Sequence, residues 1–276
     1  AAGAGLLVGL GIAAVVAFAN ATSTAQLAAA HPVAGGAWAY GRAELGPWAG
    51  FVAGWGFVIG KLASCAAMAM TFAAYAAPAG FERPVAVAAV AALTIVNLLG
   101  VTRTARLTRI LVAIVLLCLA VVVAAGATSL PTGAGWTGGE VSPYGVLQSA
   151  GLIFFAFAGY ARIATMGEEV RDPARTIPRA ILGAFAGALT VYAILAVLCL
   201  LVLGPERLAA ASAPLAELVS AAGWEWAQPV VRVGAAAASL GALLALIAGI
   251  GRTSFAMSRG GDLPGEHCLL YGNQLR

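Results

Sequence analysis

The sequence predicts an all-α integral membrane protein, built as a multi-pass bundle of helices. Of its 276 residues, 62% are hydrophobic and only 9% are charged, whereas a soluble domain of this length carries about 25% charged residues. So few charged side chains cannot cover a water-soluble globule, and a large soluble helical core would need polar outer faces that are not visible here. Several apolar runs also reach the length of about 20 residues that crosses a bilayer.

Seven apolar segments are the expected membrane spans. They are rich in Ala, Gly and Ser, and such small residues let helix backbones approach closely in lipid. The second segment is long enough to tilt or to extend beyond the bilayer. The seven segments are residues 4–29, 46–77, 84–101, 108–128, 144–165, 179–203 and 229–251.

Arginines are distributed unevenly over the loops between these segments. Cationic loops stay in the cytoplasm, so we expect a cell-membrane protein with the N-terminus of this chain outside and its C-terminus inside. One side of the membrane receives eleven arginines and the other receives three. The eleven are Arg42, Arg103, Arg106, Arg109, Arg162, Arg171, Arg175, Arg179, Arg252, Arg259 and Arg276, and the three are Arg83, Arg207 and Arg232.

The two longer outer loops differ in character. Residues 129–143 are rich in Gly and Pro and read as irregular. Residues 204–228 contain a short predicted helix with Pro214 at its start and with Leu218 and Val219 on one face. A long ordered loop of this kind serves either as a lid over a site or as a plain connector, and the sequence leaves both readings open.

A first cluster of motifs lies between the first two spans. Pro32 ends the first span, and the pair Gly35-Gly36 permits a tight turn. Trp38 and Tyr40 are amphipathic rings suited to the membrane interface. A cytoplasmic hairpin accounts for these residues without any further function.

The fifth span contains a predicted break, in the stretch FFAFAGYARIAT. Gly159 lies within the span, where Gly costs about 1 kcal/mol relative to Ala. If the helix unwinds near residues 156–160, the freed backbone groups are tolerable only where they line a cavity or bind a ligand. Broken helices at mid-membrane hold the substrates of many secondary transporters. The alternative is a glycine that only permits close helix packing.

The stretch MGEEVRDPARTIPRA, residues 166–180, follows the predicted break and places opposite charges at short spacing. One interpretation is a solvated loop with internal salt bridges. The other is a cytoplasmic gate in which Glu168 and Glu169 pair with nearby arginines, Arg162 and Arg175 among them, or with Arg103, Arg106 and Arg109. The spacing is compatible with both interpretations.

Lys61 is the only lysine and lies in the middle of the second span. It is too far from either end to extend easily to the headgroups, and ionisable residues inside a membrane usually face a cavity or a partner. A retinal-binding protein would instead carry its lysine on the last helix. No intramembrane nucleophile–base pair or metal-binding cluster is visible, so no enzyme, metal or cofactor is expected, and the scattered arginines do not indicate nucleic-acid binding.

Two longer patterns resemble the amino acid–polyamine–organocation (APC) transporter superfamily. The combination of the two is specific, and RTSFAMSRGGDLP at residues 252–264 is a third, weaker match. The pattern FFAFxGYxxxxxxxEEVxxPxRxIPxAI is present from Phe154 through Ile181. The pattern LAxxxPxxGGxxxYxxxxLGxxxGFxxGW is present as Leu27, Pro32, Gly35, Gly36, Tyr40, Leu45, Gly46, Gly50, Phe51, Gly54 and Trp55.

The resemblance implies a partial leucine-transporter-type core of inverted repeats, in which the seven segments match the superfamily's helices two to eight. Residues 1–276 would form a single transmembrane transporter domain, truncated at both ends, with residues 265–276 outside the packed core. The implied function is a secondary active amino-acid transporter, or permease, that works by alternating access and is coupled to protons. Its partners would be an amino acid, H+ and the lipid bilayer.

The resemblance also assigns residues. The unwound segment would offer backbone carbonyls to the substrate's ammonium group, and Tyr160 would act as an aromatic gate. Many members carry an acidic residue at the position of Ala161, followed here by Arg162, which argues against strongly cationic substrates. Lys61 would take the coupling role that some relatives give to a lysine of the fifth helix. A polyamine or cationic amino-acid exchanger, or a seven-helix receptor or channel, remains the alternative. The unwound segment is Phe155, Ala156, Phe157, Ala158 and Gly159.

Overall fold

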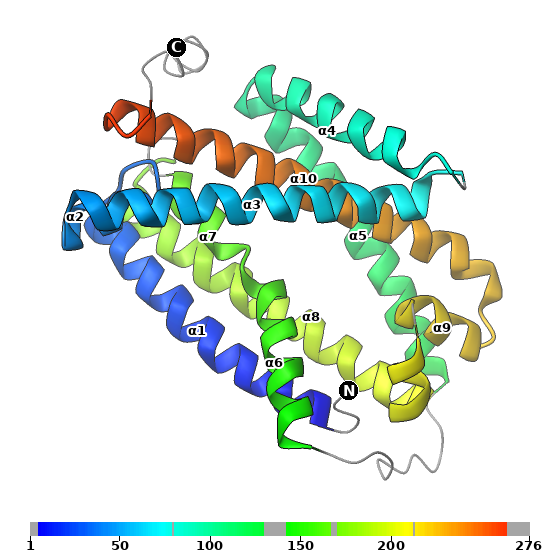
Figure 1. Ribbon diagram of the computed structural model, residues 1–276. Coiled ribbons are helices and arrows are strands. Elements are labelled where there is room, and N and C mark those ends of the chain that lie inside the picture. Colours follow the sequence, from blue (N-terminus) through cyan, green and yellow to red (C-terminus); the bar gives the residue numbers. More distant parts are fainter. Residues whose placement is uncertain (1–4, 79, 130–141, 167–169, 212, 264–276) are drawn as a thin grey trace. The chain divides into compact units, whose positions relative to one another are not determined.

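The computed structural model describes residues 5–78, 80–129, 142–166, 170–211 and 213–263. All regular elements within these residues are helical (Figure 1). The predicted irregular loop at 129–143 falls almost wholly outside the described residues, as do residues 265–276. The elements are α1 (Leu6–Ala30), α2 (Ala37–Leu45), α3 (Pro47–Ala76), α4 (Glu82–Leu98), α5 (Val101–Thr128), α6 (Pro143–Phe157), α7 (Tyr160–Ile163), η2 (Ala164–Met166), α8 (Pro173–Ala210), α9 (Pro214–Ala221), η3 (Glu225–Ala227) and α10 (Gln228–Arg259).

Six of the predicted spans are helical stretches long and apolar enough to cross a membrane, among the described residues. The all-α multi-pass prediction is therefore confirmed. The remaining predicted span, the third at residues 84–101, corresponds to the helix α4. It has 17 residues and a length of about 26 Å, slightly short of a typical bilayer core. The six are residues 6–30, 47–76, 102–128, 143–166, 173–210 and 225–259.

Local sequence signals explain where several helices begin. Pro47, Pro143 and Pro214 each occupy the first turn of their helix, where a missing N–H costs nothing. Ser142 caps α6, because its side-chain oxygen accepts a hydrogen bond from the Gly145 amide at 2.9 Å. The short helix predicted after residue 204 is therefore present as α9, with Pro214 at its start.

The helix α8 is interrupted near its end by Gly204. This residue has φ 72° and ψ 166°, a conformation that glycine adopts without steric cost. The apolar run consequently stops where the sequence predicts, at about residue 203, and residues 205–210 form a separate short turn of helix.

The chain divides into two compact units. Unit 1 comprises residues 1–21, 116–159 and 182–234, and unit 2 comprises residues 22–115, 160–181 and 235–276. The boundary passes through α1, α5, α8 and α10, and it also falls between α6 and α7. The predicted break of the fifth span thus coincides with a unit boundary.

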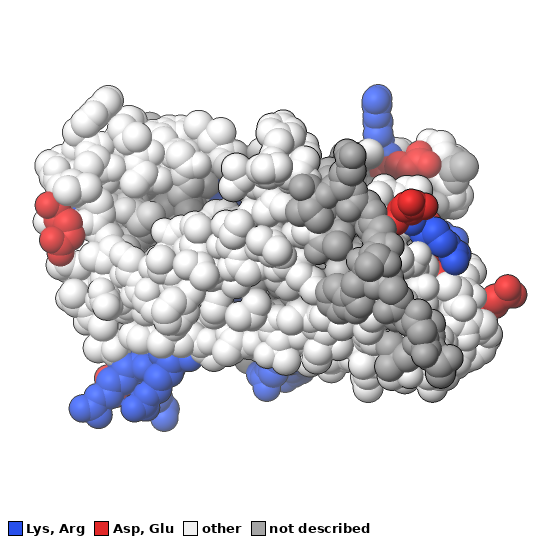
Figure 2. Space-filling model, turned by 90° about the horizontal axis from the view of Figure 1, so that it is seen from below, with Lys and Arg blue, Asp and Glu red and all other residues white. Residues whose placement is uncertain are grey.

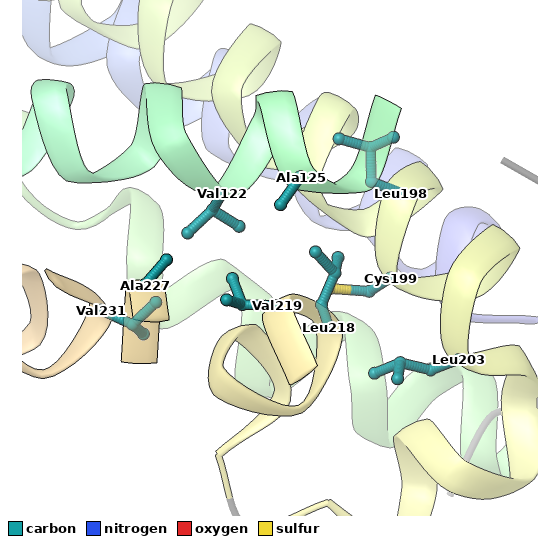
Figure 3. Close-up of a cluster of buried hydrophobic side chains, with 9 residues drawn as sticks. All are labelled: Val122, Ala125, Leu198, Cys199, Leu203, Leu218, Val219, Ala227 and Val231. Carbon is teal, nitrogen blue, oxygen red and sulfur yellow. The ribbon is translucent and has the colours of Figure 1, made fainter. Parts of the chain in front are cut away.

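Unit 1 contains two apolar clusters. The first joins α5, α8, α9 and the start of α10 and is shown in Figure 3. The second joins α1, α6 and α8 around Phe157. The first cluster consists of Val122, Ala125, Leu198, Cys199, Leu203, Leu218, Val219, Ala227 and Val231.

Unit 2 packs α3 against α4 and α10 through small side chains. Ala73 of α3 is completely buried, and so are Leu243 and Leu244 of α10. Alanines at such contacts allow helix backbones to come close. Figure 2 shows one face of the molecule, on which uncharged side chains predominate.

Candidate functional site

The fifth span is broken at Ala158 and Gly159. The helix α6 ends at Phe157, the Ala158 amide donates to the Phe155 carbonyl at 3.2 Å, and α7 begins at Tyr160. The break is therefore shorter than the predicted unwound segment, since Phe155, Ala156 and Phe157 remain helical. The reason is packing, because the Phe157 ring is buried against Phe185 and Tyr192 at centroid distances of 5.4 and 5.2 Å.

The carbonyl of Ala156 has a side-chain partner in unit 1. The Tyr192 hydroxyl of α8 donates a hydrogen bond to it at 3.1 Å. The last carbonyls of a helix lack partners within the helix, and a phenol is one way to satisfy them inside an apolar region. The Phe155 side chain is 63% exposed and does not share the packing of Phe157. Sequence reasoning missed Tyr192, which lies 36 residues from Ala156.

The other side of the break belongs to unit 2. There the Thr165 hydroxyl donates to the Arg162 carbonyl at 2.8 Å, and the Tyr40 hydroxyl of α2 donates to the Ala164 carbonyl at 3.2 Å. Burial raises the pKa of Tyr40 to about 12, so its phenol stays a protonated donor at neutral pH. Other parts of the protein cover 95% of the Tyr40 side chain, and its place at the membrane interface stays a prediction.

Trp38 is buried as well and contacts the end of α10. Its indole Nε1 donates to Asp262 Oδ2 at 2.7 Å. Arg42 Nη1 donates to both carboxylate oxygens of Asp262, at 3.1 and 3.2 Å. The Trp38 ring lies so close to Gly260 that a methyl group there would clash with it. We call Trp38, Tyr40, Arg42 and Asp262, with the Ala164 carbonyl, the α2 network.

Lys61 lies on α3 and is half-buried. Its Nζ is 5.5 Å from the centroid of the Phe57 ring, one helical turn earlier, which is cation–π distance. A methyl group at Gly249 of α10 would lie 3.8 Å both from Phe57 Cζ and from Arg162 Cγ. Within unit 2, Phe57 therefore lies near both Lys61 and Arg162. Sequence reasoning missed Phe57, since an aromatic residue in an apolar span carries no distinguishing signal.

The predicted gate is only partly described. Glu168 and Glu169 lie outside the described residues. Arg175 Nε is 4.0 Å from Asp172 Oδ2, and both side chains are well exposed, so this pair contributes little stability. The gate thus stays a prediction.

The described residues contain no group of three or more His, Cys, Asp or Glu side chains that could hold a metal ion. Cys65, Cys118 and Cys199 are buried and unpaired, as expected for cysteines that behave as small apolar residues. On its side of the break, unit 1 offers backbone carbonyls and aromatic rings, and unit 2 carries Arg162 on α7.

Comparison with known proteins finds transporters that match nearly the whole chain. A family model described as amino acid permease matches residues 1–274. An uncharacterized transporter of Mycobacterium tuberculosis is 58% identical over 266 residues, which cover 96% of this chain and 60% of the relative. The chain thus spans about three fifths of the length of this relative and of two others of equal identity.

Two more distant relatives have names that state a substrate class. The branched-chain amino acid permease BcaP of Bacillus subtilis is 25% identical over 297 residues, covering 96% of this chain and 62% of the relative. Cationic amino acid transporter 1 of Arabidopsis thaliana is 30% identical over 233 residues, covering 76% of this chain and 38% of the relative.

Proposed function

Because the chain belongs to the amino acid permease family, a family of transporters rather than enzymes, we propose that it acts in a secondary active amino-acid transporter. The transporter works by alternating access and is proton-coupled. The observation that carries this proposal is the break between α6 and α7, which lies inside a membrane-spanning stretch of residues 143–166. Non-helical backbone at that depth is tolerated where it lines a cavity or binds a ligand.

The proposed substrate site consists of the residues around the break, Phe155 to Gly159, followed by Tyr160 as an aromatic gate. The Ala156 carbonyl accepts from the Tyr192 phenol, and a substrate ammonium group would replace this donor. A charged donor forms a stronger hydrogen bond with a carbonyl than a phenol does. Binding would therefore free Tyr192 and change the packing of Phe157 against it.

Lys61 is the proposed coupling residue. It is half-buried in a spanning helix and lies 5.5 Å from the Phe57 ring. Among the described residues, no carboxylate lies within ion-pair distance of its ammonium group. Loss and gain of a proton at such a group change the local charge by one unit without disturbing a salt bridge.

The proposed orientation places the N-terminus of the chain outside the cell membrane and its C-terminus inside, following the excess of arginines in alternate loops. In that orientation α2, η2 and the end of α10 lie at the cytoplasmic side. The proposed gate of Glu168, Glu169, Arg162 and Arg175 would close the path from the break to the cytoplasm.

A cationic amino-acid or polyamine exchanger is the second candidate. The names of several relatives, among them cationic amino acid transporter 1, favour it. Against it, the described residues around the break have no acidic side chain, and Arg162 occupies α7. We therefore favour neutral amino acids as substrates, recognised by backbone dipoles and apolar walls.

The test is uptake of a panel of labelled neutral, cationic and acidic amino acids and polyamines into proteoliposomes, with and without an inward proton gradient. The Mycobacterium tuberculosis relative is assayed in parallel, because its chain is longer. Substrate-dependent stabilisation against heat measures binding separately, since a ligand of the folded state raises its melting temperature. Absence of both uptake and stabilisation with every compound would overturn the proposal.

A matched glycine pair tests the role of the break. An added methyl group meets nothing within 4 Å at either Gly159 or Gly151, both of which belong to this span. Gly159→Ala favours a continuous helix by about 1 kcal/mol and should weaken substrate binding about fivefold. Gly151→Ala lies within the regular part of α6 and should leave binding unchanged. If both substitutions weakened substrate binding equally, the break would not be part of the substrate site.

The coupling role is tested by Lys61→Met, with Ser64→Ala as the control on the same helix. The Ser64 hydroxyl bonds only to the Gly60 carbonyl of its own helix. Lys61→Met should abolish the dependence of uptake on the proton gradient while substrate binding persists. Unchanged gradient dependence would make Lys61 a structural residue.

A further inference from the structure

Three arginines lie on one exposed side of α5. The helix begins at Val101, and Arg103, Arg106 and Arg109 follow within its first three turns, all with exposed side chains. A spacing of three residues places successive side chains about 60° apart around the helix axis, so the three share one side. The opposite side holds the buried residues Thr104 and Leu111.

These arginines have no acidic partner in the part of the chain that the structure describes. None of the ion pairs there includes them, and Arg109 Nε makes a 3.4 Å hydrogen bond to the Ala105 carbonyl. The first turn of α5 contains no acidic residue either. Because a helix N-terminus already carries partial positive charge, three cations near it repel the helix dipole and one another. This arrangement favours an anion as the partner.

The surrounding residues indicate which kind of anion. Leu99 precedes the arginines and is 54% exposed, while Ile110 and Val112 follow them and are 51% and 49% exposed. A soluble anion gains nothing from apolar side chains. A phospholipid has a charged headgroup joined to acyl chains, and α5 presents cations at its start and exposed apolar residues immediately afterwards.

We propose that this α5 arginine face, defined as Arg103, Arg106 and Arg109, binds the phosphate headgroup of an anionic membrane phospholipid. The planar guanidinium group matches phosphate oxygens through paired hydrogen bonds. The acyl chains of the lipid lie along Ile110 and the apolar residues that follow it. The site takes a membrane lipid rather than a transported substrate, so it does not depend on the proposed transport function.

The experiment is native mass spectrometry of the purified chain in detergent, titrated separately with phosphatidylglycerol and phosphatidylcholine. The test variant combines Arg103→Gln, Arg106→Gln and Arg109→Gln. The matched control combines Arg83→Gln, Arg179→Gln and Arg207→Gln, three exposed arginines from other helices, and changes the net charge by the same amount. Competition with inorganic phosphate distinguishes a lipid site from a site for a soluble anion.

Each arginine near an anionic surface strengthens the attraction about fivefold, so the triple variant should bind phosphatidylglycerol on the order of 100-fold more weakly. Phosphatidylcholine binding should not change, and the control variant should bind like the wild type. Circular dichroism confirms that the variants remain helical. If the triple variant fails to fold, Arg106→Gln alone should still lose about fivefold.

Three results would overturn the proposal. The first is equal phosphatidylglycerol binding by the wild type and the triple variant. The second is an equal loss in the scattered control, which would show a general charge effect. The third is displacement of phosphatidylglycerol by inorganic phosphate at similar concentration, which would identify a soluble anion as the ligand.

Discussion

The two short helices α2 and α9 have nearly the same length, nine and eight residues, but are held in different ways. α2 belongs to unit 2 and is anchored by polar side chains that contact Asp262 and the Ala164 carbonyl. α9 belongs to unit 1 and is anchored by Leu218 and Val219, both completely buried among apolar residues. Polar anchoring is directional and depends on protonation, whereas apolar anchoring depends on volume.

The difference bears on the lid interpretation of residues 204–228. Contacts also hold the end of α9 and the residues that follow it. Gln228 Nε2 donates a hydrogen bond to Ser220 Oγ at 2.7 Å, and the Trp224 ring stacks on the Trp226 ring at a centroid distance of 5.6 Å. Opening α9 would expose Leu218 and Val219, at a cost of about 2 kcal/mol for each side chain. The lid function itself remains a prediction.

The largest expected loss of stability comes from removing an apolar side chain that anchors α9. Leu218→Ala leaves a cavity in the first cluster of unit 1 and should lower the free energy of unfolding by about 3 kcal/mol. Leu152→Ala is the control, because Leu152 is 73% exposed. Thermal unfolding in detergent measures both. If the two variants were equally stable, α9 would not be anchored by Leu218.

The next effect comes from the α2 network. Asp262→Ala leaves the buried indole N–H of Trp38 without an acceptor and should cost about 2 kcal/mol. Asp262→Asn keeps an oxygen for Trp38 and removes only the charge opposite Arg42, so it should cost less. The two variants are compared by thermal unfolding. An equal loss in both would assign the stabilisation to the Arg42 ion pair instead of the Trp38 hydrogen bond.

A smaller effect, with a pH signature, is expected at Tyr40. Its pKa is raised by burial from 10.0 to about 12. Because the unfolded phenol releases its proton first, this group's stabilising contribution is complete below pH 10 and is lost as the pH rises toward 12. Tyr40→Phe should lower the free energy of unfolding by about 1 kcal/mol at pH 8. It should also remove the fall in stability that Tyr40 causes as the pH rises above 10. Denaturant unfolding of both proteins from pH 8 to pH 11 gives the difference, and parallel curves would contradict it.

The smallest effect is expected at the entrance to α2. His31 Nε2 lies 2.7 Å from Glu44 Oε1, and the two side chains are 31% and 54% exposed. Exposed ion pairs contribute less than about 1 kcal/mol, so Glu44→Gln should change stability only slightly at low salt. A loss as large as that of Asp262→Ala would mean that this surface pair, and not the buried network, anchors α2.

Composition and periodic apolar runs were sufficient to predict the class of fold and the approximate limits of the spanning helices. Gly159 indicated the position of the break, and Pro214 indicated the start of α9, because glycine and proline act on the backbone locally. The length of the break was not predictable. It depends on how Phe157 packs against Phe185 and Tyr192, and those rings come from a different helix.

For the candidate site too, some residues were predicted from the sequence and others depended on helix packing. Lys61 was proposed as a candidate from residue type and depth in a span, and the stretch from Phe155 to Gly159 was proposed from the family resemblance. Tyr192 and Phe57 were not, since a tyrosine or phenylalanine in an apolar helix is unremarkable until its neighbours are known.

The sequence by itself determined that the chain is a multi-pass helical membrane protein, since hydrophobicity is a property of single residues and short runs, and Gly159 marked a position where the backbone could break. Only the tertiary structure decided which distant groups the side chains of α2 bind. Asp262 lies 224 residues from Trp38 in the chain and Tyr40 lies 124 residues from Ala164, and no local pattern encodes such pairs. A hydrogen bond depends on positions in space, which arise only when helices far apart in sequence pack together.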